Sequence, residues 1–93
     1  MQQDNQKQLE GLREQLLKTK KWPLRYMFKF VMPNDKETLA VVQSMMPNGG
    51  AVSYKNSANG KYVAMTYVVN MPNADSIVSL TASVSALPNV MAL

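Results

Sequence analysis

Three cations and one tyrosine have the residue types and the spacing for contact with a nucleic acid. Arg25 and Lys29 alternate with apolar residues in one segment, and Lys61 directly precedes Tyr62 in another. Cationic side chains contact phosphate, and an exposed tyrosine ring stacks on bases, as in RNA-binding domains built on an open sheet. A single ring is a small stacking platform, and Met27 stands where the facing segment would need a second ring. RNA binding is therefore an alternative hypothesis, and we do not expect nucleic acid as the main partner.

Catalytic groups are scarce in this sequence. It contains neither histidine nor cysteine, which excludes disulfides, thiolate nucleophiles, zinc fingers and imidazole bases. Asp35, Glu37 and Asp75 fall in the first turns of expected helices, where an acidic side chain interacts favourably with the helix dipole. The serines at 76, 79, 83 and 85 have no base to activate them. We therefore expect no enzymatic activity, no metal and no cofactor.

Length and charge indicate one small basic domain. The chain has 93 residues, of which 46% are hydrophobic, and carries a formal net charge of +4. Residues 1–29 hold the whole excess of positive charge along the sequence, and it is densest at Lys18–Lys21. Such a patch attracts phosphate or an acidic protein surface, or it is a solvated helix end. The polar start lacks the apolar core of a signal peptide, and no apolar run approaches the ~20 residues of a membrane helix, so we expect a cytoplasmic location without membrane contact.

Four strands are expected from the apolar patterns. Segment 24–32 is apolar at every even position, which indicates one buried face, with Arg25 and Lys29 on the other. Segment 61–71 is apolar on both faces, as in a central strand. A shorter, more polar strand is expected at 51–57, and a last one at 90–93. Asn59-Gly60 predicts a type I′ turn, in which both central residues have positive φ.

Two helices are expected between turns marked by proline and asparagine. Met-Pro-Asn occurs at 32–34, 46–48 and 71–73, and Leu-Pro-Asn at 87–89. Asn34 and Asn73 are the expected N-caps, with Glu37 completing a capping-box-like pair in the first helix. The resulting order β-α-β-β-α-β predicts an α+β, ferredoxin-like sandwich with a four-stranded antiparallel sheet, over 22–93. Right-handed crossovers place the first and third strands in the centre and both helices on one face.

One face of this expected sheet has no helix over it. Arg25, Met27, Lys29 and Val31 should lie there, beside Tyr62, Ala64, Thr66 and Val68.

The N-terminal segment 1–21 is expected to be an extension of this domain. Residues 1–8 look like a frayed polar tail, and 9–21 look helical. Leu9, Leu12 and Leu16 form a short apolar stripe on this helix, with Leu17 adjacent. The stripe must be covered either by the protein's own sheet or by a second subunit, and the sequence does not distinguish the two.

Several short stretches carry a family resemblance. They are Leu16-Leu17 followed by Trp22-Pro23, the strand-like Tyr26–Val31 with Lys29 inside it, the turn Lys55–Tyr62 and the terminal Val90–Leu93. These stretches resemble the YbeD-like family, a domain family of small bacterial proteins without an established activity. The resemblance covers about three quarters of the chain and implies an ACT-like ferredoxin fold. By analogy with ACT domains it also implies a regulatory or ligand-sensing role.

These observations lead to one functional expectation. We expect a non-enzymatic regulatory or interaction domain that binds a partner protein or a small ligand and forms a homodimer, because an apolar bare sheet face and a leucine stripe both need cover. A ligand would bind near the loop 33–35, at helix N-terminal amides. The expected binding residues are Arg25, Met27, Lys29, Asn34, Lys61 and Tyr62.

Overall fold

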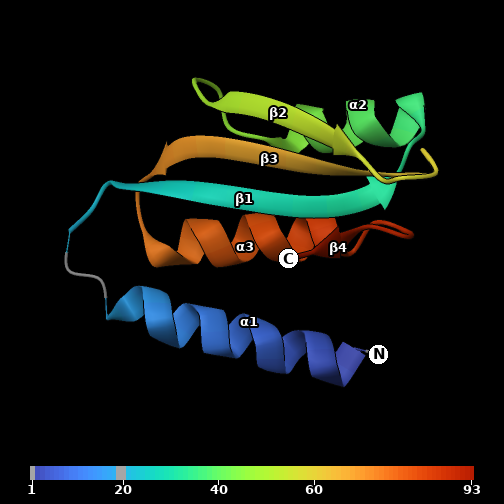
Figure 1. Cartoon of the computed structure of the whole chain (residues 1–93). Coiled ribbons are helices and arrows are strands. Elements are labelled where there is room, and N and C mark those ends of the chain that lie inside the picture. Colours follow the sequence, from blue (N-terminus) through green and yellow to red (C-terminus); the bar gives the residue numbers. More distant parts are fainter. Residues whose placement is uncertain (1, 19–20) are drawn as a thin grey trace.

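The protein is an α+β structure with one sheet and three helices. The computed structural model describes residues 2–18 and 21–93 (Figure 1). Its elements are α1 (Gln2–Leu17), β1 (Leu24–Pro33), α2 (Lys36–Met45), β2 (Ala51–Asn56), β3 (Tyr62–Met71), α3 (Ala74–Ser85) and β4 (Met91–Ala92). The four strands form an antiparallel sheet in the order β2-β3-β1-β4. This arrangement is compatible with a small ferredoxin-like fold.

The centre of the sheet is the pair β1–β3, as the apolar patterns predicted. Both strands have ten residues and pair along their whole length, from Leu24 opposite Met71 to Pro33 opposite Tyr62. The even residues of β1 and the odd residues of β3 therefore share one face. On that face Phe28, Phe30, Met32 and Met65 are buried, together with residues of the helices that cover it.

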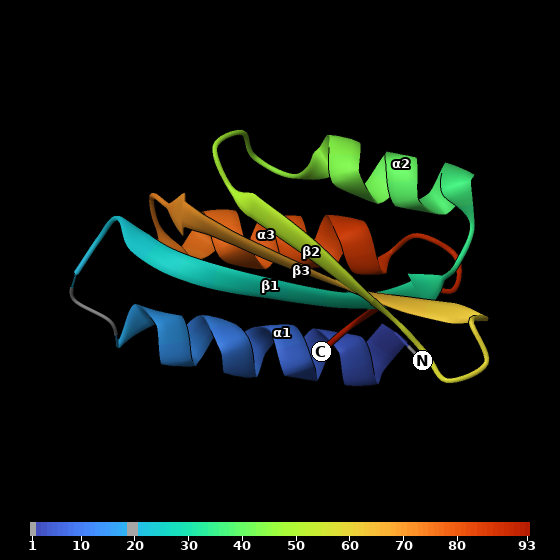
Figure 2. The same ribbon diagram turned by 45° about the horizontal axis from the view of Figure 1, so that its top comes forward.

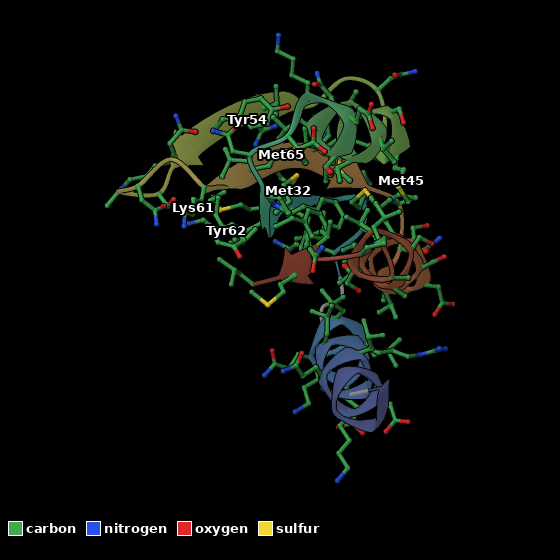
Figure 3. All side chains as sticks on the ribbon, turned by 90° about the vertical axis from the view of Figure 1, so that its right-hand side faces the viewer. Met32, Met45, Tyr54, Lys61, Tyr62 and Met65 are labelled. Carbon is green, nitrogen blue, oxygen red and sulfur yellow. The ribbon has the colours of Figure 1, made fainter. Side chains whose placement is uncertain are left out.

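Helices α2 and α3 cover this face, and α1 packs on α3. Figures 1 and 2 both show α3 between α2 and α1. Figure 3 views the strands end-on, with Met32 and Met65 between the sheet and the helices and with Tyr62 on the other side. Val42 of α2 and Ile77 and Val84 of α3 complete the buried core. One sheet face thus carries the core, and no described helix covers the other.

One of the two predicted N-caps is wrong. Asp35, not Asn34, caps α2: its Oδ1 accepts from the Glu37 N–H at 3.3 Å, and its Oδ2 accepts from the Thr38 hydroxyl at 3.1 Å. Asn34 does not act as the cap because its side chain donates to the Gly60 carbonyl and its backbone N–H donates to the Lys61 carbonyl. Asn73 caps α3 as expected, accepting from the Ser76 N–H at 2.8 Å.

The N-terminal helix differs from its expected bounds. It begins at Gln2 rather than after a frayed tail, since its first residues include no helix-breaking glycine or proline. It ends at Leu17, so Lys18 and Lys21 lie beyond it, and Lys20 lies outside the described residues. The helix packs on α3 of its own chain, where Leu16 is buried and Arg13 contacts Asp75 at 3.1 Å. Leu16 and Leu12 of the leucine stripe therefore pack against the chain's own core, whereas Leu9 is half-buried.

Two turns fix the position of β2. Gly50 lies so close to Tyr67 that a Cβ there would come within 2.8 Å of the Tyr67 hydroxyl, which accepts from the Gly50 N–H and donates to the Pro47 carbonyl. The β2–β3 turn is not type I′, because Gly60 has positive φ and Asn59 does not. Asn59 acts through its side chain instead, and its Oδ1 accepts from the Lys61 N–H at 3.1 Å.

Candidate functional site

The sheet face opposite the helices, here called the open face, is the main candidate for binding. The register places there the odd residues of β1, the even residues of β3 and the odd residues of β2. Met91 joins them opposite Val31, and Leu93 follows, donating its N–H to the Lys29 carbonyl at 2.9 Å. All eight residues expected on a bare face of β1 and β3 have this orientation: Arg25, Met27, Lys29, Val31, Tyr62, Ala64, Thr66 and Val68.

Large apolar side chains are exposed on the open face. Met27 is 57% exposed, Tyr62 49%, Met91 61% and Leu93 73%. Between them Val31 and Val68 are half-buried by their neighbours. Four such side chains on one face form an apolar surface of the kind that marks an interaction site, whereas single exposed residues need no explanation.

The charge of the open face has one sign. Arg25, Lys29 and Lys55 project from it, and Lys61 lies in the turn at its end (Figure 3). None of the six acidic residues of the chain lies in a strand, since all of them fall in the helices or at an N-cap. The open face and the turn at its end therefore carry four cations and no acidic side chain.

The structure divides the six predicted binding residues into two groups. Arg25, Met27 and Lys29 lie within the first six residues of β1, whereas Lys61 and Tyr62 lie at the other end of the open face. Tyr62 is opposite Pro33, eight positions from Arg25, which is roughly 26 Å along a strand. The predicted residues thus mark the two ends of one surface rather than one compact site.

Asn34 has a structural role. Its Nδ2 donates to the Gly60 carbonyl at 3.0 Å, and its backbone N–H donates to the Lys61 carbonyl at 2.9 Å. Both bonds hold the β2–β3 turn against the end of β1. Asn34 therefore positions Lys61 and Tyr62. A hollow of about 200 Å³ beside Tyr62, lined also by Val31 and Lys55, lies at this end.

The loop expected to hold a small ligand borders a larger hollow. It has a volume of about 420 Å³ and is lined by Pro33, Asp35, Glu37, Thr38, Val41, Leu87, Pro88 and Asn89. One of the α2 amides that were expected to bind a ligand, that of Glu37, already donates to the Asp35 carboxylate. Two carboxylates on one wall disfavour an anionic ligand at this place.

The sequence did not indicate three residues of the open face. Lys55, Met91 and Leu93 are placed there by strand register, with Lys55 opposite Ala64 and Met91 opposite Val31. The alternation of β2 alone shows that Lys55 and Ser53 share one face and that Tyr54 lies on the other, but it does not show which of the two faces is the open face. Only the hairpin register, which the turn determines, identifies the face.

Tyr26 is a half-buried tyrosine on the helix side of β1. Its ring meets Phe28 edge-on, with ring centroids 4.8 Å apart. Burial raises the pKa of the Tyr26 hydroxyl, because the phenolate would lose hydration. The group is neutral at physiological pH and serves as an apolar surface.

Comparison with known proteins gives no relative for this chain. No family model matches it, and neither does a curated protein or a solved structure. Within residues 2–18 and 21–93 no helix has the length and hydropathy to span a membrane. The same residues contain no cluster of three or more acidic side chains arranged to hold a metal ion.

Proposed function

We propose that this chain is a non-enzymatic interaction domain that binds an acidic partner protein through its open face. The proposal rests on one observation: exposed apolar side chains and positive charges lie together on a sheet face that no described helix covers. An acidic protein surface with apolar residues at its centre would complement both properties. Charge complementarity of this kind accelerates association and excludes basic surfaces.

The finer fold assignment belongs to the same proposal. The strand order supports a ferredoxin-like, ACT-like architecture, and with it a regulatory role by analogy. The resemblance to the YbeD-like family and the cytoplasmic location stay predictions.

The homodimer also stays a prediction, and only one of its two motives is left, because the leucine stripe packs on α3. Two open faces brought together would set cations against cations, which is unfavourable. An acidic partner of different sequence therefore fits this face better than a second copy does.

RNA is the second candidate for the same surface. Lys55 and Lys61 flank the exposed Tyr62 ring, and the adjoining hollow leaves the ring accessible. One ring stacks one base, so the affinity would depend mainly on phosphate contacts and fall steeply with salt.

Matched charge and surface variants test the proposal. The full chain is immobilised, and proteins retained from native lysate are identified with and without nuclease treatment. Tyr62→Glu alters the open face, whereas Val41→Glu alters a residue of α2 that is 45% exposed on the helix side. We expect an acidic protein to be retained by the wild type and by Val41→Glu but not by Tyr62→Glu. Equal retention by all three overturns the proposal, and retention abolished by nuclease transfers the site to RNA.

A further inference from the structure

The first half of β1 has a strand on one side only. β4 pairs with Phe30 and Val31, and Leu93 adds one bond to Lys29. From Leu24 to Phe28 the strand pairs with β3, and no described strand lies at its other edge (Figure 1). The sheet therefore has a vacancy in line with β4.

The backbone of this edge points toward the vacancy at alternate residues. The N–H of Asn34 donates to β3, and the carbonyl of Lys29 accepts from the β4 side, so even residues face β3 and odd residues face the edge. The N–H and C=O groups of Arg25 and Met27 therefore point out of the sheet. No residue in the described ranges 2–18 and 21–93 bonds them. They are free to pair with an added strand.

A groove runs on the helix side of the same edge. Leu9 and Leu12 of α1 form one wall, Tyr26 and Phe28 of β1 form the other, and Thr81 of α3 contributes to the lining. The groove has a volume of about 260 Å³, and its lining also includes Gln8, Lys29, Phe30, Ala92 and Leu93. A strand paired with β1 would turn every second side chain into this apolar space.

We propose that this edge binds an extended peptide segment of a partner, antiparallel to β1 and in line with β4, with acidic and apolar residues in alternation. Main-chain hydrogen bonds to Arg25 and Met27 supply affinity, and the groove selects side chains, as in other cases of strand addition. The main-chain groups of this site lie at the strand edge, and only Arg25 and Lys29 are shared with the open face, so the site does not depend on the function proposed for that face.

The positive charges of Arg25 and Lys29 favour an acidic peptide at this edge. Side chains of the added strand on the open-face side would lie next to Arg25 and Lys29, within reach of cross-strand pairing. No strand of this chain contains an acidic residue, and β2, the other edge strand, carries Lys55. A second copy cannot offer a complementary strand, whereas a foreign acidic segment can.

The register specifies the peptide position by position. Continuing β4 beyond Leu93, its residues would stand opposite Phe28, Met27, Tyr26, Arg25 and Leu24 in turn. Those opposite Phe28, Tyr26 and Leu24 enter the groove side and are apolar. Those opposite Met27 and Arg25 are acidic. A matching probe is the capped pentapeptide acetyl-Leu-Glu-Val-Glu-Val-amide.

Backbone methylation of this probe gives a matched test. The second and fourth residues, opposite Met27 and Arg25, would exchange hydrogen bonds with β1, whereas the N–H of the third points away. Binding is followed by amide shifts of the labelled full chain. We expect N-methylation of the second and fourth residues to weaken binding at least tenfold and N-methylation of the third to change it less than twofold. Equal effects of both methylations overturn the proposal.

Amide exchange supplies a second readout. In the free protein the amides of Arg25 and Met27 should exchange fast and those of Tyr26 and Phe28 slowly, and the probe should protect the first pair. Slow exchange of Arg25 and Met27 without peptide overturns the proposal, as it shows an edge already covered. Such protection appearing only at high protein concentration identifies a second copy as the occupant and likewise overturns the proposal.

Charge reversal tests the two cations that this site shares with the open face. The double variant Arg25→Glu with Lys29→Glu should lose the acidic probe and bind the corresponding Lys-containing probe. Lys61→Glu, at the far end of the open face, should bind the acidic probe within twofold of the wild type. An unchanged affinity of the double variant for both probes refutes the charge assignment. Failure of these probes leaves the open-face proposal intact, because its test rests on Tyr62.

Discussion

Leu16 and Leu17 offer a direct test of how α1 is attached. The two residues are adjacent at the end of the helix, but Leu16 is 7% exposed and Leu17 is 61% exposed. Truncating a buried leucine to alanine costs about 2–5 kcal/mol, whereas a surface truncation stays within about 0.5 kcal/mol. Leu16→Ala should therefore destabilise the docking of α1, and Leu17→Ala should not.

The remaining attachments of α1 are weaker than the Leu16 contact. Leu9 and Leu12 are half-buried, and the ion pair between Arg13 and Asp75 is exposed on both sides, where such pairs contribute about 0–1 kcal/mol. A loss of about 2 kcal/mol or more is comparable with everything else that holds the helix. We therefore expect α1 to open without unfolding of the sheet.

Amide hydrogen exchange measures this opening element by element. In Leu16→Ala the protection of α1 amides should fall by about thirty-fold or more, the factor that corresponds to ~2 kcal/mol, while β3 amides change less. The open α1 removes one wall of the groove, so the acidic probe should also bind more weakly. Equal loss of protection in α1 and β3 would refute local opening, and a similar effect of Leu17→Ala would refute the assigned burial.

Two further predictions concern the packing that supports the sheet. Gly50→Ala should destabilise the fold by about 1–3 kcal/mol, because the added methyl group displaces the buried Tyr67 ring. Gly11→Ala, which has no side chain near it, should be neutral or stabilising by up to about 1 kcal/mol. Thermal unfolding of both variants measures the difference. For Tyr26 the folded pKa lies above the unfolded value of 10.0, so its contribution to stability is complete below about pH 10 and is lost as the pH rises through the folded pKa. Urea titrations from about pH 8 to about pH 11 should show a smaller decline for Tyr26→Phe than for the wild type, and parallel declines would contradict this reason.

The alternation of apolar and polar residues along the strands was the most useful signal for predicting the sheet. The even apolar positions of β1 determined which side of the strand is buried, so Arg25, Met27 and Lys29 could be placed on the bare side from sequence alone. The same argument placed Tyr62, because β3 is long and continuous with its turn. What alternation cannot give is the pairing of a short strand, and Lys55 and Met91 were missed for that reason.

Helix ends and turns were harder to predict because several residues compete for one role. Asn34 and Asp35 are both good N-caps, and the choice depends on where β1 stops bonding to β3. Asn59 tolerates positive φ but uses its side chain to close the turn. The vacancy beside Arg25 has no sequence signal, since it results from β4 being two residues long beside a strand of ten.

The edge strand β2 affects how readily copies of the protein aggregate through their sheets. All six of its residues are exposed, and Lys55 is its only charged side chain. An unpaired edge strand can pair with the edge strand of another copy, which leads to aggregation, and a lysine on the edge commonly prevents this. Both edges of the sheet are at least partly unpaired, so the cations on the edge strands, Lys55 on β2 and Arg25 and Lys29 on β1, oppose side-by-side pairing of copies.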